Sequence, residues 1–281
     1  MSYNYKAGGN SEVTGPRVSV VMGIGRIDPY FREAIDSILA QSFQDFEFLI
    51  VIDAAIRELK DEILRSYPRG DRIKLLLSTS LGGLAYKLNI GIGEARGEYI
   101  ARMDADDISR PDRLLEQVRY MDEHKDVAVL GCRVQMIDSN SIRIERNYPF
   151  YESDREIRRM LPLRNPMVHP ALMFRRSALY SVNGYRYGNA AEDYEMFLRI
   201  ARDPELRFHN LDKILFDYRR HALQVTGLSR VKINYQEKAG FLFTEFLRTG
   251  SPKYLCGILL MHPFVYRTRM FFRKRVMGAG I

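Results

Sequence analysis

The chain has 281 residues, with 46% hydrophobic and 28% charged side chains, which is the composition of an ordinary globular protein. Its two cysteines, Cys132 and Cys256, form no disulfide framework and have no zinc-ligand spacing, which favours a reducing compartment. The net charge of +8 is concentrated after Phe246, where seven Lys and Arg residues and no Asp or Glu occur, so the remainder carries only +1. A nearly neutral body argues against a nucleic-acid-binding protein.

The first half of the chain alternates strand-like and helix-like segments. Short apolar runs predict strands at residues 17–22, 47–52, 73–77 and 98–103. A helix is predicted to open at Asp28 and Pro29, with Asp28 as its N-cap, and another is predicted over 84–92. Such alternation predicts an α/β fold with a mostly parallel sheet flanked by helices.

The second half is less regular. Amphipathic helices are predicted at 112–124 and 192–201, and buried strands at 127–131 and 168–174. Segments 134–137 and 142–146 flank a turn at Asp138 and predict a hairpin.

The two ends of the chain differ from its body. Residues 1–16 are polar and lack the apolar core of a signal peptide, so we expect a flexible leader on a cytoplasmic protein. Residues 17–230 are expected to form one domain, and 231–281 a helical, basic tail. In that tail, 254–266 is apolar but too short to span a bilayer, and a basic cluster follows at 267–275. Two interpretations remain open: a segment lying in the plane of an anionic membrane, or helices packed back onto the domain.

Three aspartates, Asp104, Asp106 and Asp107, directly follow the strand predicted at 98–103. Ligands of open α/β sheets bind beyond the carboxyl ends of strands, so this is a suitable place for a site. Carboxylates on a turning chain can converge on a divalent cation, whose charge offsets their mutual repulsion. The alternative is a solvated acidic turn that caps the helix predicted at 112–124.

Other acidic positions also have two interpretations. Asp53 ends the strand at 47–52, and it either accepts a hydrogen bond from a nucleotide base or caps the following loop. Glu192 and Asp193 begin a helix, whose N-terminus stabilises carboxylates. They form either a favourable first turn or supply the general base that activates an acceptor hydroxyl.

A Gly23-x-Gly25 turn follows the first strand and matches neither a dinucleotide fingerprint nor a P-loop. It is either a point where a nucleotide approaches the backbone or a plain turn. His169 and His221 have no metal-ligand spacing with other residues. Their default role is structural hydrogen bonding, and the alternative, which Glu192 shares, is contact with a phosphate or an acceptor.

Several motifs follow one another in order along residues 18–226. They include Val18-Ser-Val-Val-Met, Gly83-Leu-Ala-Tyr-Lys-Leu-Asn, Ala95-Arg-Gly-Glu-Tyr-Ile-Ala-Arg-Met-Asp-Ala-Asp-Asp, Pro111-Asp-Arg-Leu and Ala191-Glu-Asp-Tyr-Glu-Met. Together they resemble the inverting family 2 glycosyltransferases with the GT-A fold, of the bacterial polysaccharide and lipopolysaccharide type. The resemblance implies a GT-A nucleotide-binding sheet.

The resemblance also implies roles for the matching residues. The nucleotide-sugar donor would be bound by Gly23, Asp53, Lys87, Asp104 and Asp106. Among these, Asp53 would contact a uracil-like base, and Asp104 would touch the ribose side of the donor. Asp106 would hold a divalent cation, Mn²⁺ or Mg²⁺, that bridges the diphosphate. Asp193 would be the base that deprotonates the attacking acceptor hydroxyl.

The activity implied is metal-dependent, inverting transfer of a sugar from a nucleotide-sugar, expected to be a UDP-sugar, to a glycan or lipid-linked acceptor. The enzyme would lie at the inner face of the plasma membrane. The chain has no Trp and so lacks the Gln-x-x-Arg-Trp signature of processive synthases, which predicts one sugar per binding event. Two alternatives stay open: a sugar-phosphate nucleotidyltransferase, and an inactive scaffold that binds nucleotide or carbohydrate.

Overall fold

Four apolar runs of the first half form the parallel part of one sheet. The computed structural model describes residues 15–67, 72–78, 83–145, 148–221 and 231–265. The strands are β1 (Val18–Ile24), β2 (Phe46–Asp53), β3 (Ile73–Ser78) and β4 (Tyr99–Met103). They lie in the order β3-β2-β1-β4, and each neighbouring pair is parallel. All residues of β2 and β4 are buried, as in strands that are covered on both faces.

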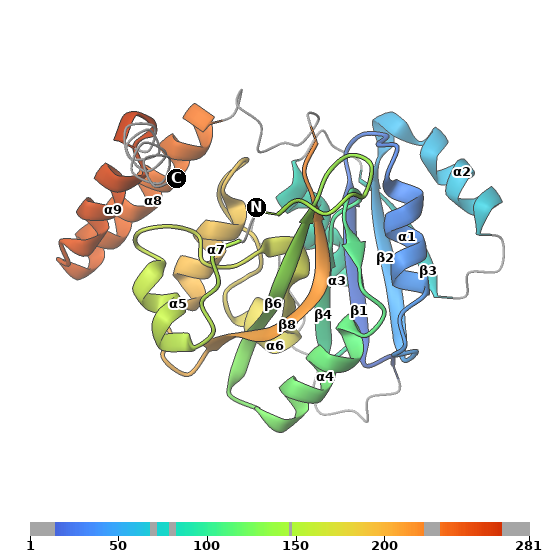
Figure 1. Ribbon diagram of the computed structural model, residues 1–281, viewed down its shortest axis with the longest axis horizontal. Helices are drawn as coiled ribbons and strands as arrows, with labels where there is room; N and C mark the ends of the chain where they lie inside the picture. The colour runs from blue at the N-terminus through green and yellow to red at the C-terminus, as the bar shows by residue number, and fades with distance from the viewer. Residues whose placement is uncertain (1–14, 68–71, 79–82, 146–147, 222–230, 266–281) are drawn as a thin grey trace, which may run out of the picture.

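The sheet continues beyond β4 with strands of mixed direction (Figure 1). These are, in spatial order, β7 (Met173–Arg175), β6 (Val127–Ile137), β8 (Arg207–Arg219) and β5 (Ile108–Ser109). β7 is antiparallel to both of its neighbours, whereas β6 and β8 run parallel with register shifts around Arg133. The mostly parallel sheet expected from the sequence is confirmed.

Helices cover both faces of the sheet because side chains of a strand alternate between its faces. The helices are α1 (Phe31–Leu39), α2 (Glu58–Ser66), α3 (Leu84–Glu94), α4 (Arg113–Glu123), α5 (Asp154–Met160), α6 (Arg176–Ser181) and α7 (Glu192–Ile200). Apolar residues of α1, α2 and α4 pack with Val18, Val20 and Met22 of β1. Those of α3, α5, α6 and α7 pack with Val21 on the other face. The result is a three-layer α/β/α arrangement.

The C-terminal part is helical, as expected, and packs onto the domain. It comprises α8 (Val231–Thr249) and α9 (Lys253–Met261), which lie together at one end of the molecule (Figure 1). Leu242 of α8 is fully buried, and Ile258 of α9 lies against the same core cluster. Among the described residues, no helix combines the length and the apolar character needed to cross a membrane. The basic cluster at 267–275 lies outside the described residues.

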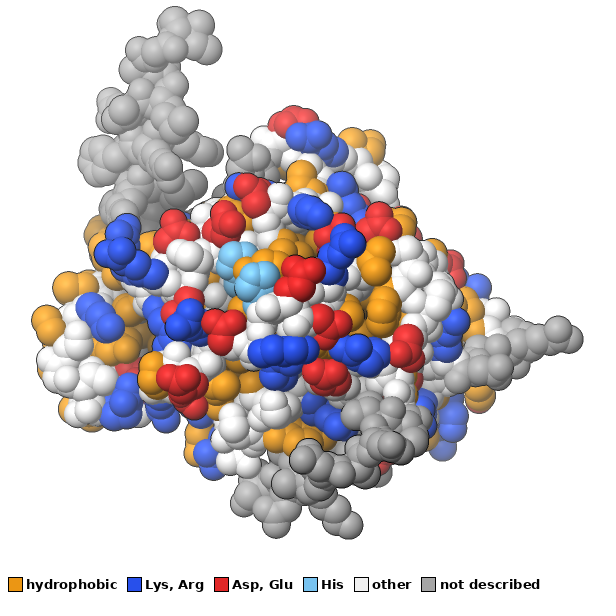
Figure 2. Space-filling view, turned by 90° about the horizontal axis from the view of Figure 1, so that it is seen from below, with side chains coloured by type: hydrophobic (Ala, Val, Ile, Leu, Met, Phe, Trp, Pro, Cys, Tyr) orange, Lys and Arg blue, Asp and Glu red, His pale blue; other side chains and the backbone are white. Residues whose placement is uncertain are grey.

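The surface of the described part carries charges of both signs. On the face shown in Figure 2, Lys and Arg side chains are interspersed with Asp and Glu side chains. Ion pairs at the surface of the described residues include Lys213 with Glu116 at 2.7 Å. This distribution agrees with the nearly neutral charge of the body of the chain.

The first helix begins later than predicted. It starts at Phe31, and Tyr30 occupies the N-cap position without a side-chain cap. Asp28, the expected cap, instead accepts a hydrogen bond from the N–H of Tyr30 at 3.1 Å within the preceding loop. Asp28 is thereby held outside the helix, at the end of the sheet where the aspartates gather.

Two strand predictions were also wrong in their limits. Residues 127–131 and 134–137 form one continuous strand, β6, because β8 pairs with it along its whole length. The predicted hairpin shrinks to one bridge between Ile137 and Arg143. The strand predicted at 168–174 begins with a 3₁₀ turn, His169–Ala171, so that only residues 173–175 pair in the sheet.

Candidate active site

The carboxyl ends of β1, β2 and β4 meet at one edge of the sheet, because these strands are parallel neighbours. Asp53 is the last residue of β2, and Asp104 directly follows β4. Asp28 lies in the loop between β1 and α1. The fold therefore collects acidic side chains from three loops at the edge where ligands of such sheets bind.

Asp53 and Lys87 form a buried ion pair at this edge. Lys87 extends from α3, and its Nζ lies 3.1 Å from Asp53 Oδ2, with the two side chains 4% and 10% exposed. The N–H of Ala55 donates to Asp53 Oδ1 at 3.1 Å, and this bond together with Lys87 lowers the pKa of Asp53. Asp53 is therefore an ionised acceptor that also caps the loop after β2.

Gly23 lies where α3 packs against β1. A Cβ at Gly23 would stand 3.0 Å from Leu84 Cδ1 and 3.2 Å from Lys87 Cβ, so the absence of a side chain permits close helix–strand packing. Gly25 is the glycine beside the charged group, because a Cβ there would lie 3.6 Å from Lys87 Nζ. Gly23 thus has a packing role, and its contact with a nucleotide stays a prediction.

A buried arginine that the sequence analysis missed lies beneath the acidic residues. Arg102 in β4 is 2% exposed, and its Nη2 lies 2.6 Å from Asp104 Oδ1. Its charge also opposes the rise in the pKa of Asp107, Glu192 and Asp193. The available signal was an arginine inside an apolar strand just before an acidic cluster, since a buried guanidinium needs a charged partner.

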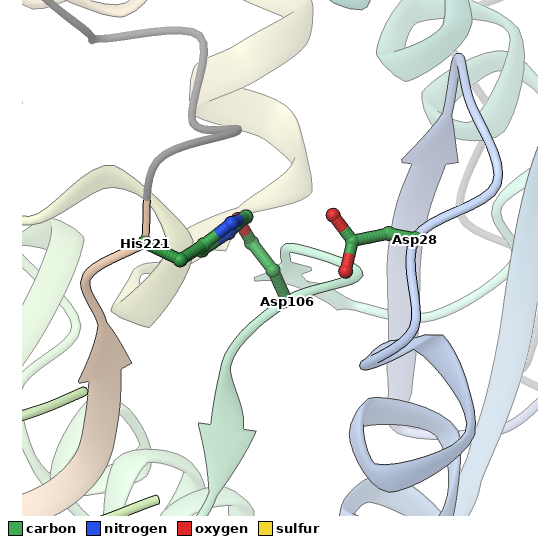
Figure 3. A group of neighbouring side chains, drawn as sticks. All are labelled: Asp28, Asp106 and His221. Carbon is green, nitrogen blue, oxygen red and sulfur yellow. The ribbon is translucent and has the colours of Figure 1, made fainter. Parts of the chain in front are cut away.

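Asp106 pairs with His221 and faces Asp28 (Figure 3). His221 follows β8, and its Nε2 lies 2.8 Å from Asp106 Oδ2. Asp28 reaches toward the pair from the loop after β1. Burial and the charge of Asp104 raise the pKa of Asp106, and His221 opposes this rise. His221, whose default interpretation was structural, therefore belongs to the acidic cluster, and Asp28 is a second residue that sequence reasoning missed.

Two groups of side chains here have the spacing needed to hold a cation. In the first group, ligand atoms of Asp28, Asp106 and His221 all lie within 4.8 Å of one another. The second group, with the same spacing, consists of Asp104, Asp106 and Asp107. Carboxylate oxygens suit Mg²⁺ and Mn²⁺, and imidazole is a ligand that transition-metal ions accept. The donor groups at Asp106 therefore fit a divalent cation.

Asp107 connects this loop to β8. The N–H of Arg219 donates to Asp107 Oδ1 at 2.8 Å, and Arg219 Nε donates to the carbonyl oxygen of Asp106 at 2.7 Å. Asp107 is 1% exposed, and burial together with the neighbouring aspartates raises its pKa well above the usual value. Its Oδ2 is buried and accepts no hydrogen bond from the described residues. Such an oxygen is satisfied either by a proton or by a cation.

Glu192 and Asp193 form the first turn of α7. Asp193 Oδ2 accepts a hydrogen bond from Asn165 Nδ2, and Asp193 Oδ1 accepts one from the N–H of Tyr194, both at 2.7 Å. Burial raises the pKa of Asp193, and burial with the charge of Asp193 raises the pKa of Glu192 to about 7. The charge of Asp104 acts in the same direction on Glu192, which links α7 electrostatically to the end of β4. Glu192 is a buried residue, and Asp193 is a partly buried one.

His169 makes a structural hydrogen bond, and its contact with a phosphate or an acceptor stays a prediction. Its Nε2 shares a hydrogen bond of 2.5 Å with the hydroxyl of Tyr185. Burial lowers the pKa of His169 well below the usual value, so the ring stays neutral. Tyr185 in turn exchanges two backbone hydrogen bonds with the amide of Asn89. This chain of contacts joins the loop before β7 to α3 beneath the site.

The sequence has clear relatives. A sequence model of the family described as Glycosyl transferase family 2 matches residues 19–182. The O-antigen biosynthesis glycosyltransferase WbnJ of Escherichia coli is 33% identical over 233 residues, which covers 82% of this chain and 89% of that protein. The uncharacterized glycosyltransferase MJ1057 of Methanocaldococcus jannaschii is 31% identical over 269 residues, covering 95% of this chain and 89% of that protein.

Solved structures share the fold at lower identity. TarS of S. aureus superposes with a TM-score of 0.66 at 20% identity, covering 91% of this chain and 74% of that one. Mannosyltransferase PcManGT from Pyrobaculum calidifontis, solved with GDP-Man and Mn²⁺, gives a TM-score of 0.62 at 19% identity, covering 91% and 71%. Sequence and fold agree, and we conclude that this chain is a glycosyltransferase that belongs to glycosyltransferase family 2 and has the GT-A fold.

Proposed function

We propose that the chain transfers a single sugar, with inversion and with the help of a divalent cation, from a UDP-sugar to a glycan or lipid-linked acceptor in cell-surface polysaccharide synthesis. The main observation in support is that the Asp53–Lys87 pair and the Asp106–His221 pair lie at one edge of the sheet. In addition, the charge of Asp104 contributes to the raised pKa of Glu192 in the first turn of α7, after burial and the charge of Asp193. WbnJ is named for O-antigen biosynthesis, which supports this acceptor class. Family membership favours this activity over a nucleotidyltransferase and over an inactive scaffold.

The donor's base would bind at Asp53. Its ionised carboxylate is a strong acceptor for a base N–H, and Lys87 keeps it ionised. The backbone at Gly25 lies beside the Lys87 amine, so the diphosphate can pass close to a positive charge. TarS has been solved with UDP and with UDP-GlcNAc, which supports a uridine donor, whereas PcManGT was solved with GDP-Man.

Asp106 would hold the cation, with His221 and Asp28 beside it. When bound, such a cation supplies positive charge against the negative charge that develops on the departing diphosphate. Asp104 is fixed by Arg102 at 2.6 Å and would orient the ribose side of the donor. PcManGT was solved with Mn²⁺, which supports a divalent cation in this chain as well.

Asp193 would act as the general base. It removes the proton of the acceptor hydroxyl while the hydroxyl oxygen bonds to C1 of the donor sugar and the bond from C1 to the diphosphate breaks. The proton remains on Asp193, and the nucleoside diphosphate leaves. The hydrogen bonds from Asn165 and Tyr194 fix the carboxylate in one orientation. Attack from the face opposite the leaving group inverts the configuration at C1.

We propose that the acceptor binds in a cavity of about 250 Å³ that is lined by residues of β6 and β8 and by residues 143–145 and 148–150. Its lining includes Tyr148, Phe150, Gln135 and Asn210, and aromatic faces with amide groups suit a sugar ring. Burial and then the charge of Asp193 raise the pKa of Tyr148.

We also propose that the C-terminal tail holds the enzyme at the inner face of the plasma membrane. The apolar side chains of Leu259 and Phe264 are 67% and 69% exposed, and the basic residues at 267–275 follow them in the sequence. The full chain should co-sediment with vesicles that contain anionic phospholipid, and a chain that ends at residue 265 should not. Equal co-sedimentation of both would refute this role of the tail.

The base assignment is tested by Asp193→Asn, with Asp45→Asn on the exposed surface as the control. Calorimetry should give Asp193→Asn the affinity of the wild type for UDP with Mn²⁺. Its sugar transfer should fall by about 100-fold or more, because the proton acceptor is removed. Transfer at the level of the Asp45→Asn control would refute the assignment of Asp193.

A further inference from the structure

Helix α8 binds the segment that leads into α7. The carboxylate of Glu237 accepts three backbone hydrogen bonds, from the N–H groups of Asn189, Ala190 and Ala191, at 2.9, 2.9 and 3.0 Å. Asn234, one turn earlier in α8, donates to the carbonyl oxygen of Ala190. The C-terminal helix α8 therefore fixes three consecutive residues that directly precede the first turn of α7, which carries Asp193.

This contact supplies what α7 lacks locally. Ala191 is the N-cap residue of α7, and it has no side chain that could accept a hydrogen bond. The N-terminal N–H groups of a helix need an acceptor and favour negative charge. Glu237, from another element, accepts the N–H of the N-cap residue Ala191 and of the two residues before it, and it brings a carboxylate to this end of the helix. Gly188 closes the same turn with φ +99°, and Glu237 Oε2 would lie 3.1 Å from a Cβ at this position, so a side chain there would disturb the contact.

The next residue, Lys238, lies near the first turn of α7. Its Nζ lies 5.4 Å from the ring centroid of Tyr194, the residue after Asp193. The charge of Lys238 lowers the pKa of Asp193 against the effect of burial. Burial in turn lowers the pKa of Lys238, and the charges of Asp193 and Glu192 oppose this.

Other groups around Asp193 also influence its charge. They are Glu192 on α7, Arg102 in β4, Asn165, and the tyrosines Tyr148 and Tyr185. Asp104 acts on the neighbouring Glu192. Arg102 Nη2 lies 2.6 Å from Asp104 Oδ1, so the charge of Arg102 acts on Asp104 as well as on Asp193. Lys238 is the cation that approaches from the C-terminal helix.

The position of α8 itself is fixed by the body of the domain. Glu245, 2% exposed, forms ion pairs with Arg202 at 2.5 Å and with Arg248 at 2.8 Å. Leu242 is fully buried in the core cluster that contains α7. A helix held in this way can place Glu237 and Lys238 reproducibly.

We propose that α8 is part of the catalytic apparatus, in which Glu237 and Lys238 are positioning residues for Asp193. Glu237 fixes the backbone that aims Asp193 at the acceptor, and Lys238 brings a positive charge to the first turn of α7, 5.4 Å from the ring centroid of Tyr194. The proposal rests on the function proposed above, in which Asp193 is the base. It gives the C-terminal region a role in the chemistry in addition to any membrane contact.

The test uses the full chain and the variants Lys238→Met, Lys238→Arg and Glu237→Gln, with exposed Lys232→Met on the same helix as the matched control. The probe is whichever of UDP-, GDP- and dTDP-sugars the wild type hydrolyses fastest with Mn²⁺, with water as the acceptor. Nucleotide release is followed from pH 5 to 9, and thermal melting identifies variants that do not fold.

The expected result is specific to each variant. Lys238→Met moves the acid limb of the kcat profile up by roughly one pH unit, because removing the positive charge raises the pKa of Asp193. Lys238→Arg, which keeps the charge, stays within a few tenths of a unit of the wild type. Glu237→Gln lowers kcat by about 10- to 100-fold through misplacement of the base, with the donor KM unchanged.

Two outcomes separate the failures. If Asp193→Asn abolishes release but folded Lys238→Met and Glu237→Gln behave like Lys232→Met, this inference is wrong and the proposed function stands. If Asp193→Asn itself retains full activity, the base assignment fails, and this inference falls with it. A rise in KM without a change in kcat or in the pH profile would likewise overturn the positioning role.

Discussion

Replacing Lys87 with Met breaks the buried ion pair on the nucleotide side of the site. At 3.1 Å and an effective dielectric constant of about 20, the attraction between Lys87 and Asp53 is on the order of 5 kcal/mol, before desolvation is subtracted. Removing one partner of a buried pair costs roughly 3 to 5 kcal/mol. Asp53 keeps its hydrogen bond from Ala55, so we expect about 3 kcal/mol, the lower end of that range.

This loss depends on pH in a defined direction. The folded-state pKa of Asp53 is lowered, so its contribution is present above the unfolded pKa of about 4 and is lost as the pH falls through the folded value. In Lys87→Met the buried carboxylate lacks its cation, and its pKa rises. The difference in stability between wild type and variant should therefore be full at pH 7 and shrink below about pH 4.

Thermal and urea unfolding at pH 7 and at low pH measure this difference. A loss of about 3 kcal/mol corresponds to a fall in Tm of roughly 6 to 12 °C for a domain of this size. Lys74→Met is the matched control, because Lys74 pairs with Glu94 at 2.6 Å while both side chains are about half exposed. Exposed pairs contribute about 0 to 1 kcal/mol. If Lys87→Met costs no more than Lys74→Met, the reasoning about the buried pair is wrong.

Three further variants test other parts of the account. Glu192→Gln removes a carboxyl whose pKa is raised to about 7 in the folded chain. As the pH rises toward this value, the unfolded chain has already released the proton that folded Glu192 still binds, so Glu192 destabilises the wild type. The stability of the variant relative to the wild type should therefore increase as the pH rises from 5 to 7.5, by on the order of 2 kcal/mol in chemical unfolding. His221→Ala should weaken Mn²⁺ binding by about tenfold or more in calorimetry, because Asp106 loses a neighbouring ligand. Gly97→Ala should cost about 2 to 3 kcal/mol, because the new Cβ would lie 2.5 Å from the backbone nitrogen of Ser19.

Each of these variants has an outcome that contradicts its prediction. A pH-independent stability difference for Glu192→Gln would show that this carboxyl does not titrate near neutrality. Unchanged Mn²⁺ affinity in His221→Ala would remove the imidazole from the cation site. Gly93→Ala in α3 is the control for Gly97→Ala, since a Cβ added at Gly93 would have nothing within 4 Å of it. Equal effects at both glycines would refute the packing argument.

The parallel half of the fold could be predicted because its signals are local. β1, β2 and β4 are short, mostly apolar runs, and an acidic residue ends each run or follows it closely. Parallel strands place their carboxyl ends together, so the location of the aspartate cluster followed from sequence order alone. The helical spacing of α3 and α7 was equally clear.

β8 was missed because its pattern is mixed. It contains Asp212 and Lys213 in its middle, and register shifts interrupt its pairing with β6, so apolar residues do not alternate regularly. α5 was missed although a signal was present. Ser153 and Glu156 form a capping box at its start, and this spacing marks a helix N-terminus in a sequence.

The partners of the site residues could not be predicted, because they come from distant elements. Asp28 was assigned to a helix cap, and only the fold brings it beside Asp106. Glu237 and Lys238 lie more than 40 residues after Asp193 in a helix that showed no functional motif. Contacts of this kind depend on how α8 packs, and no local pattern in the sequence encodes that packing.

The central claim, cation-dependent transfer from a nucleotide-sugar at Asp106, is tested most directly by nucleotide release. Purified wild-type chain and Asp106→Ala are incubated with UDP-, GDP- and dTDP-sugars, with Mn²⁺ and with chelator. The account predicts release from a UDP-sugar that requires Mn²⁺ and is lost in the variant. Release that is equal in wild type and Asp106→Ala, or unaffected by the chelator, would contradict it.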